Sequence, residues 1–270
     1  MIKLFVCDID NTLISRHVGL PKANLAAILA LQKSGVTVAL ASGRVSSGML
    51  ELAETLQLKH YGGYVIAANG AYVRSMKDDR ILLNDLIDLP ELKALTAEVQ
   101  SLGIHASIQQ GDILHYLFED EAVMYDRDII GLKVEGHQDL SAYLYEPSNK
   151  IEMSAWMDAD PIPFDVFAAR HHQQYSLIRG RGTFLDVMPK GVTKASGMAV
   201  VMKELGLELD EVAAIGDGEN DRAMLQAAGL SATLVGAHAS LHEDVDHVVA
   251  PAEQAGLSHF AHLVLSKNAN

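Results

Sequence analysis

Short apolar runs alternate with helix-like segments at both ends of the chain, and this alternation limits the fold most strongly. We expect buried strands at residues 2–7, 36–42 and 64–73, the last leading to a turn at Asn69-Gly70. The later run EVAAIGDG is expected as a strand and a turn, and SATLV as another strand. A helical pattern opens at Pro21 and is expected to end at Gly35. Apolar runs separated by helices predict a mostly parallel sheet with both faces covered. The expected fold class is therefore α/β, with a Rossmann-like, doubly wound parallel sheet as its core.

The middle of the chain interrupts this pattern. It is less regular and carries most of the aromatic residues, and five of the seven prolines lie in or near it. We interpret residues 84–183 as an inserted α/β cap domain, which leaves residues 1–83 and 184–270 as a discontinuous core domain.

The charge, cysteine content and apolar stretches of the sequence limit the partners, the disulfides and the location of the protein. The formal net charge of the 270 residues is -14, and no dense block of Lys or Arg offsets it. Such a surface repels nucleic acid and anionic membranes, so we expect neither as a partner. The single cysteine, Cys7, excludes an internal disulfide, and no apolar stretch approaches the length of a membrane span. The start MIKLFVCDID does not read as a signal peptide, so a cytoplasmic location is expected.

Four short polar segments follow apolar strands or open helices. They are DIDNTL (residues 8–13), SGR (42–44), PKGVTK (189–194) and GDGEND (216–221). In an open parallel sheet, ligands bind beyond the carboxyl ends of the strands. We therefore expect the first, second and fourth segments to meet in space.

The side chains of these segments suit phosphoryl transfer. Several carboxylates in one crevice repel one another unless a cation neutralises them, and an all-oxygen ligand set suits Mg²⁺. One carboxylate can then attack phosphorus while a second moves protons. The Ser42 hydroxyl and nearby backbone N–H groups can hold phosphate oxygens, and Lys194 can offset their charge. Each segment alone has an ordinary structural explanation as a turn or a helix cap, whereas all four together favour a phosphate site.

The four segments, together with AANGA (67–71), LDVMPKGVTKASGM (185–198) and GDGENDRAML (216–225), resemble the haloacid dehalogenase-like phosphatases. The chain is most similar to their Cof-type sugar-phosphatase branch, over essentially its whole length. The resemblance implies a phosphoric monoester hydrolase that acts on small phosphorylated metabolites, with sugar phosphates first and pyridoxal or flavin phosphates as the alternative. It also implies Mg²⁺ as the cofactor, and a cap that closes over the site and chooses the substrate.

The resemblance further implies a role for each motif residue. Asp8 is the nucleophile that forms an aspartyl-phosphate, and Asp10 is the general acid and base. Asp8, Asp217 and the backbone carbonyl of Asp10 hold the metal ion. The phosphate is bound by Ser42, Gly43, Lys194 and Asn220, while Asp221 steadies Lys194 or the water molecules on the metal.

Two segments depart from the family pattern. Asn11 stands where the family usually has Gly, and Asn tolerates the left-handed backbone that such a turn needs. The stretch VGAHAS (235–240) replaces a segment that usually reads like GNA. This second departure keeps open a protein of the same fold that binds a metabolite without turning it over.

Other chemistries fit the sequence less well. A thiol phosphatase built on Cys7 would need Arg six residues later, where the chain has Leu13. A dinucleotide-binding loop would have glycine in place of the Asp221 carboxylate, which would repel a pyrophosphate. We interpret His238, His242 and His247 as a solvated face rather than a metal site. The positive charges of Arg44, Arg179 and Arg181 could contact a second anionic group of the substrate, but we interpret each of them as an exposed charge.

Overall fold

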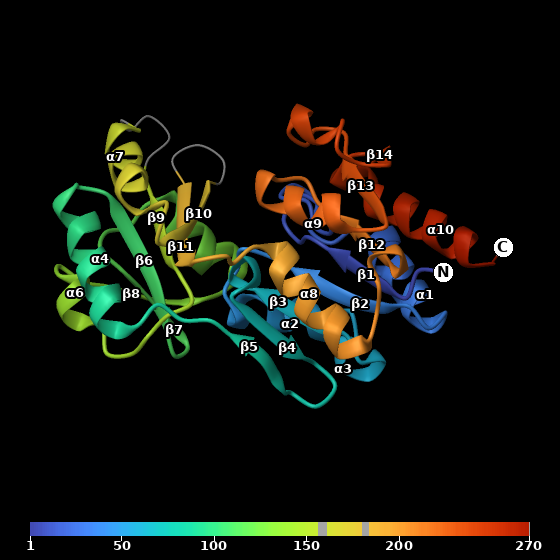
Figure 1. Cartoon of the computed structure of the whole chain (residues 1–270), viewed down its shortest axis with the longest axis horizontal. Coiled ribbons are helices and arrows are strands. Elements are labelled where there is room, and N and C mark those ends of the chain that lie inside the picture. Colours follow the sequence, from blue (N-terminus) through green and yellow to red (C-terminus); the bar gives the residue numbers. More distant parts are fainter. Residues whose placement is uncertain (156–160, 180–183, 270) are drawn as a thin grey trace. The chain divides into compact units, whose positions relative to one another are not determined.

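The computed structural model of the chain divides into two compact units, and it describes residues 1–155, 161–179 and 184–269. The first unit comprises Met1–Leu83 and Thr193–Asn270, and the second comprises Asn84–Val192. Each unit has a sheet and helices of its own (Figure 1).

One sheet of mixed direction forms the middle of the first unit. In the described residues its strand order is β14-β13-β12-β1-β2-β3-β4-β5. All neighbours from β14 to β3 run parallel, and only then does β4 pair antiparallel with β3. The strands are β1 (Leu4–Cys7), β2 (Thr37–Ala41), β3 (Tyr64–Ala67), β4 (Tyr72–Ser75), β5 (Ile81–Asn84), β12 (Val212–Ile215), β13 (Leu230–Leu234) and β14 (His247–Val249). This arrangement confirms the predicted α/β class with a parallel core.

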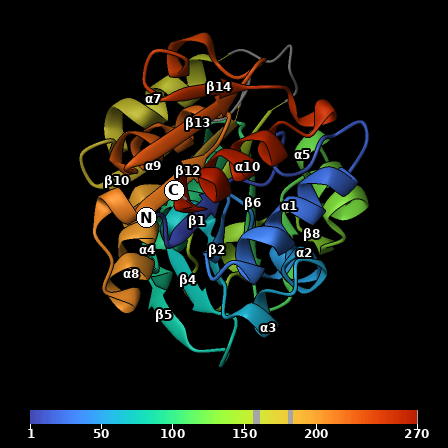
Figure 2. The same cartoon turned by 90° about the vertical axis from the view of Figure 1, so that its right-hand side faces the viewer.

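Helices cover both faces of this sheet, which explains why its central strands are apolar throughout. Successive residues of a strand point to opposite faces. Phe5 and Cys7 of β1 enter the core beneath α1 (Lys22–Lys33), α2 (Leu50–Thr55), α3 (Leu58–Tyr61) and α10 (Gly256–Ala269). Leu4 and Val6 enter the opposite core, beneath α8 (Lys194–Leu205) and α9 (Arg222–Ala227). Figure 2 shows α1 and α8 on either side of β1 and β2.

The run from 64 to 73, expected as a strand leading to a turn at Asn69-Gly70, does turn there and returns as a second strand, so that it forms a hairpin. β3 ends at Ala67, the chain turns through Ala68–Gly70, and β4 runs back beside β3. Two residues of the turn require a positive φ, which is 52° at Asn69 and 108° at Gly70. Asn and Gly tolerate that backbone best, so the local sequence favours a turn over an uninterrupted strand.

The start of α8 is fixed against this turn. Thr193 caps the helix, since its hydroxyl accepts from the Ser196 amide at 3.1 Å and the Ser196 hydroxyl accepts from the Thr193 amide at 3.0 Å. The helix and the turn approach so closely that a Cβ atom at Gly70 would lie 2.1 Å from the Thr193 carbonyl oxygen. Glycine at 70 therefore sets the position of the first residue of the helix, Lys194.

The second unit is a separate α/β layer. Its described strands form a sheet in the order β10-β11-β9-β6-β7-β8. The unit extends to Val192 because β11 pairs with both β9 and β10. Its elements are α4 (Leu89–Ser101), β6 (His105–Gln110), β7 (Ile113–Tyr116), α5 (Glu121–Tyr125), β8 (Lys133–Gly136), α6 (Leu140–Tyr143), β9 (Ile151–Ser154), α7 (Ile162–His171), β10 (Tyr175–Arg179) and β11 (Phe184–Pro189).

The two faces of this second sheet differ in polarity. One face is apolar and packs on α4, α6 and α7 through residues such as Leu92, Leu140 and Phe167. Alternate positions of β6, β9 and β11 place polar side chains on the other face. These side chains are also buried and include His105, Ser107, Glu152, Ser154 and Asp186.

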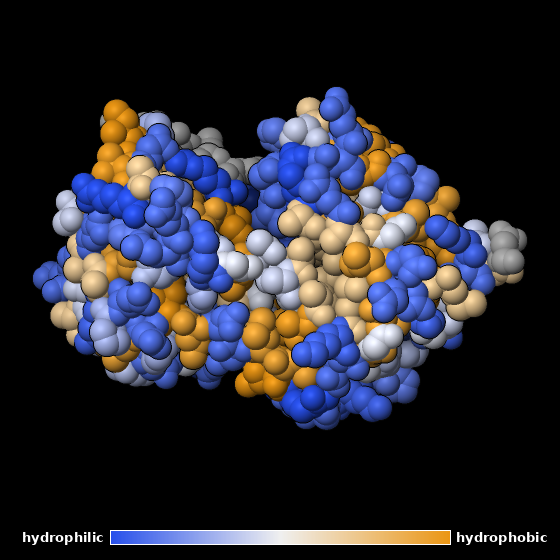
Figure 3. Space-filling view, viewed as in Figure 1, coloured by the Kyte–Doolittle hydropathy of each residue, from blue (hydrophilic) through white to orange (hydrophobic). Residues whose placement is uncertain are grey.

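Hydrophilic residues cover much of the face seen in Figure 3, with apolar residues in scattered patches between them. Within the described residues, every helix is too short or too polar to cross a bilayer.

The close approach of the turn to α8 predicts an unequal effect of two glycine substitutions. Gly206, just past the end of the same helix, also has a positive φ of 65°, but nothing lies within 4 Å of a Cβ added there. We expect Gly206→Ala to lower the free energy of unfolding by about 1 kcal/mol through backbone strain alone. Gly70→Ala adds a collision with Thr193 and should lower it by about 1–3 kcal/mol more. Urea denaturation measures both, and equal losses would contradict this packing argument.

Candidate active site

The first polar segment leaves the sheet directly from β1. Asp8 follows Cys7, and its amide donates to the Ile215 carbonyl oxygen of β12 at 3.0 Å. Asp8 is 5 % exposed, whereas the side chain of Asp10 is 26 % exposed. Asn11 has a φ of 59°, the left-handed conformation expected for a residue that stands in place of glycine.

Lys194 joins this segment to the last one. Its Nζ lies 2.6 Å from Asp8 Oδ1 and 2.6 Å from Asp221 Oδ1, and its side chain is 1 % exposed. Burial alone would lower the pKa of Lys194, but the Asp221 and Asp8 carboxylates outweigh burial and raise the pKa above its ordinary value. Lys194 is therefore a permanent cation. Removing one partner would leave an uncompensated buried charge, at a cost of about 3–5 kcal/mol.

The GDGEND loop curls around the Asp221 carboxylate. Asp221 Oδ2 accepts hydrogen bonds from the amides of Asp217 at 3.1 Å and Gly218 at 2.9 Å. Gly216 is needed here, because a Cβ atom at that position would lie 2.4 Å from Asp221 Cγ. Both oxygens of Asp221 thus accept protein hydrogen bonds, and this residue acts on the site by holding Lys194 and the loop.

Three carboxylates converge at this point. Oxygens of Asp8, Asp217 and Asp221 lie within 4.8 Å of one another, and all three residues are buried. Thr12 Oγ1 donates to Asp217 Oδ1 at 3.4 Å, so the first segment also contacts the metal-ligand candidate of the last. Burial raises the pKa of Asp8 well above its usual range; Lys194 opposes this shift, and Asp221, Asp217 and Asp10 reinforce it. The cluster therefore carries an excess of negative charge that a divalent cation would relieve.

The second segment meets the last one through Asn69. The Ser42 carbonyl oxygen accepts from the Asn69 amide at 2.9 Å, and the Ser42 hydroxyl accepts from the Arg44 amide at 3.2 Å. A Cβ atom at Gly43 would lie 3.3 Å from the Asn69 side chain. The Asn69 carboxamide oxygen in turn accepts from Asn220 Nδ2 at 3.0 Å. The three phosphate-binding candidates Ser42, Gly43 and Asn220 thus surround one buried residue, Asn69.

Sequence reasoning missed Asn69 as a member of this site. Asn69 was expected only as a turn residue within the AANGA segment. The available signal was a polar Asn at the end of an otherwise apolar strand, directly before a glycine. A buried amide at such a position must find hydrogen-bond partners, and these partners come from the other motifs.

The interpretation of Arg44 as an exposed charge is wrong. Its side chain is only 10 % exposed, and its guanidinium forms a two-point ion pair with Asp10. Nε lies 2.9 Å from Asp10 Oδ2, and Nη2 lies 2.7 Å from Asp10 Oδ1. Nη1 also donates to the Gly48 carbonyl oxygen at 3.2 Å. By contrast Arg179, in the second unit, is half exposed and pairs with Asp165, and Arg181 lies outside the described residues.

Cys7 takes no part in the chemistry. It is fully buried within β1, and burial, reinforced by the neighbouring Asp8, raises the pKa of its thiol. A thiol in that state does not ionise to the nucleophilic thiolate at neutral pH. The structure thus agrees with the rejection of a thiol mechanism.

The VGAHAS stretch follows β13 and is tied to the start of α9. Arg222 Nη2 donates to Ser240 Oγ at 2.5 Å, and Arg222 Nε donates to Glu219 Oε1 at 2.6 Å. His238 bonds Ser240, and His242 lies 3.4 Å from the Leu234 carbonyl oxygen. Among the described residues these histidines join no cluster of three metal-ligand side chains.

Comparison with known proteins agrees with this geometry. Residues 5–260 match the sequence profile of the haloacid dehalogenase-like hydrolases. A Streptococcus pyogenes protein provisionally named a phosphatase is 25 % identical over 267 residues, which cover 96 % of each chain. The HMP-PP phosphatase of Escherichia fergusonii is 24 % identical and covers 96 % of this chain and 94 % of its own.

The fold is shared with solved structures as well. One is a subclass IIB sugar phosphatase of the same superfamily, with a TM-score of 0.83 and 23 % identity over 97 % of this chain and 98 % of its own. The family profile matches almost the whole sequence, and phosphatases are among the relatives. Both findings agree with the buried carboxylates after the strands and the buried lysine at the start of α8. This chain belongs to the haloacid dehalogenase-like hydrolases and is a phosphatase of that family.

Proposed function

We propose that the chain is a Mg²⁺-dependent phosphatase that hydrolyses small phosphorylated metabolites through an aspartyl-phosphate on Asp8. The observation that carries the proposal is the buried Lys194, held at 2.6 Å by both Asp8 and Asp221, with Asp217 in the same carboxylate cluster. A fixed cation beside converging carboxylates is the arrangement that phosphoryl transfer requires, because catalysis there depends on positioning and charge neutralisation.

The donor set fits a hard divalent ion. Asp8 and Asp217 offer carboxylate oxygens, and the backbone carbonyl of Asp10 is the third expected ligand. One ammonium from Lys194 faces three carboxylates, and the negative excess adds to burial, the main cause, in raising the pKa of Asp8. When bound, the ion supplies the positive charge that lets Asp8 and a phosphate approach each other.

The chain's own residues account for both steps of the hydrolysis. An oxygen of Asp8 bonds to phosphorus as the phosphorus–oxygen bond to the leaving group breaks, and Asp10 gives its proton to the departing oxygen. A water molecule then attacks phosphorus, Asp10 takes the proton of that water, and phosphate and free Asp8 result. Ser42, Gly43, Asn220 and Lys194 are proposed to hold the phosphate oxygens throughout.

Arg44 is proposed to position Asp10. Nε and Nη2 of its guanidinium donate to the two oxygens of the Asp10 carboxylate, and Nη1 donates to the Gly48 carbonyl oxygen. The general acid and base is the more exposed of the two aspartates. A two-point contact restricts both the position and the plane of the carboxylate.

Sugar phosphates are the first candidate substrates, supported by the fold shared with a sugar phosphatase. The relative named as an HMP-PP phosphatase supports adding HMP-PP and phosphorylated cofactors, such as pyridoxal and flavin phosphates, to the same screen. The second unit is proposed to serve as the substrate-selecting cap, and the cytoplasm is the proposed location. Mg²⁺-dependent release of phosphate from an aryl phosphate separates an enzyme from a binding protein that has lost the chemistry.

The nucleophile is tested by Asp8→Asn. The amide cannot form the aspartyl-phosphate, so turnover should fall by about three orders of magnitude or more, the scale seen when a nucleophile is deleted. Phosphate release under excess substrate measures this, and thermal melting confirms that the variant is folded. Near-normal turnover would mean that water attacks phosphorus directly.

The metal site is tested by substituting two acidic residues of one loop, a proposed ligand and a control. Asp217→Asn removes a proposed ligand, and we expect the Mg²⁺ concentration for half-maximal activity to rise by at least about ten-fold. Glu219→Gln is the matched control, because the Glu219 carboxylate is exposed and pairs with Arg222. The control should keep the normal Mg²⁺ dependence. Equal shifts in the two variants would exclude Asp217 as a specific ligand.

The positioning role of Arg44 is tested by Arg44→Lys, which keeps the charge and loses the two-point grip. We expect kcat to fall by about 10²-fold, the typical cost of a misplaced catalytic group, with little change in KM. Arg74→Lys, at a surface pair with Asp79, is the control. A large rise in KM with an unchanged kcat would instead identify Arg44 as a substrate contact.

A further inference from the structure

Three metal-ligand side chains gather at the edge of the second unit's sheet, in no motif of the phosphatase site. β7 and β8 run parallel, and their register pairs His115 with Glu135. His137 follows the end of β8, where its amide donates to the Tyr116 carbonyl oxygen at 2.8 Å. Residues two apart along a strand share one face, so the side chains of Glu135 and His137 both lie beside His115.

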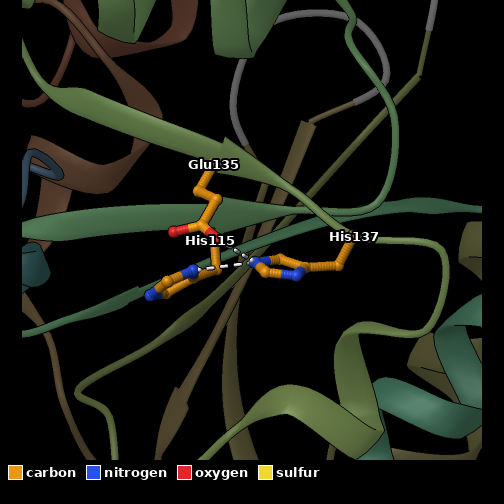
Figure 4. Close-up of side chains that lie close together, drawn as sticks. All are labelled: His115, Glu135 and His137. Atoms are coloured by element: carbon orange, nitrogen blue, oxygen red, sulfur yellow. Dashed lines mark hydrogen bonds and ion pairs between the residues drawn. The ribbon is translucent and has the colours of Figure 1, made fainter.

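The ligand atoms of the three side chains point at one another. His115 Nδ1 lies 2.9 Å from His137 Nε2, and Glu135 Oε1 lies 4.0 Å from the same nitrogen. All three ligand atoms lie within 4.8 Å of one another. Figure 4 shows the two imidazoles facing each other through these nitrogens, with the Glu135 carboxylate turned toward them.

In the ion-free chain one proton can lie between His115 Nδ1 and His137 Nε2, so that one ring donates and the other accepts. Displacing that proton frees a lone pair on each nitrogen for a metal ion. The Glu135 carboxylate adds a full negative charge beside the two rings. Two neutral imidazoles and a carboxylate are the ligands of a divalent transition metal.

The rings are held in place before any ion arrives. The His137 ring stacks on Tyr143 with centroids 3.8 Å apart and an angle of 27° between the planes. The side chain of His115 is enclosed, since the residue is only 1 % exposed. Glu135 is 47 % exposed and leaves the cluster open to an ion from solvent. Two nitrogens that packing already holds in place reduce the ordering cost of binding.

We propose that His115, Glu135 and His137 form a second metal site, which binds Zn²⁺ or a similar transition-metal ion and leaves further positions for water. The site differs in kind from the carboxylate cluster of the first unit, where all ligands are oxygens and suit Mg²⁺. An ion here would join β7 to β8, the last strand of its sheet. Its role is to secure that edge, independently of phosphate hydrolysis.

The experiment is a zinc titration of the full chain against a chromophoric chelator, with excess Mg²⁺ present to occupy the oxygen site. The wild-type chain should bind one tightly held Zn²⁺. His137→Gln should weaken zinc binding by at least about 100-fold, because even the loss of a partner behind a ligand costs about 10- to 100-fold. His238→Gln is the matched control, since that histidine is exposed and its ring bonds Ser240 in the first unit, and the variant should bind zinc as the wild type does.

A second variant guards against a folding defect. Glu135→Gln alters an exposed side chain and should leave the melting temperature of the zinc-free chain unchanged, yet it should weaken zinc binding by at least about ten-fold. Co²⁺ offers an independent signature, because nitrogen-ligated Co²⁺ of low coordination number absorbs visible light strongly. The proposal is overturned if the wild type binds no zinc with Mg²⁺ present. Equal zinc affinity in wild type, His137→Gln and Glu135→Gln would overturn it too.

Discussion

The ammonium group of Lys194 is enclosed by protein, and the geometry of the phosphatase site depends on it. A buried cation is tolerated only where carboxylates compensate it, and here Asp8 and Asp221 both do so at 2.6 Å. The lysine thereby joins segments that lie 186 residues apart in the chain. It neutralises only part of the negative charge, because Asp217 belongs to the same cluster. The charge that is left over makes a divalent cation the natural complement of the site.

The order of strands in the sheet makes this ion pair possible. β1 lies between β12 and β2, all parallel, so the segments that follow them emerge at one edge. Asp8, the GDGEND loop and Ser42 are neighbours for that reason. The hairpin after β3 then brings Asn69 beside Ser42 and Asn220. The close contact of its Gly70 with Thr193 sets the position of the start of α8, and thus of Lys194. A packing contact between two backbones therefore positions the only ammonium group among the described residues that bonds Asp8.

The two units use different ligand chemistry. The carboxylate cluster of the first unit follows from loops at strand ends, whereas the proposed histidine site of the second lies on the strands themselves. Parallel pairing of β7 with β8 places His115 opposite Glu135, and two residues of strand geometry bring His137 to the same face. Oxygen donors suit Mg²⁺ and imidazole nitrogens suit transition-metal ions, so the two sites favour different ions.

Sequence alone was sufficient for the α/β class, the parallel core and the location of the polar segments, because strand burial and helix caps leave local patterns. It also predicted that Asn11 would tolerate its turn. Pairing decided the rest: the return of β4 along β3, the two-point grip of Arg44 on Asp10, the amide of Asn69 and the cluster around His115. Each of these contacts joins residues that are separated along the chain by no regular helix or strand spacing, so no sequence pattern predicts the contact. Local patterns record which side chains are buried, but only the folded sheet decides which buried polar groups must satisfy one another.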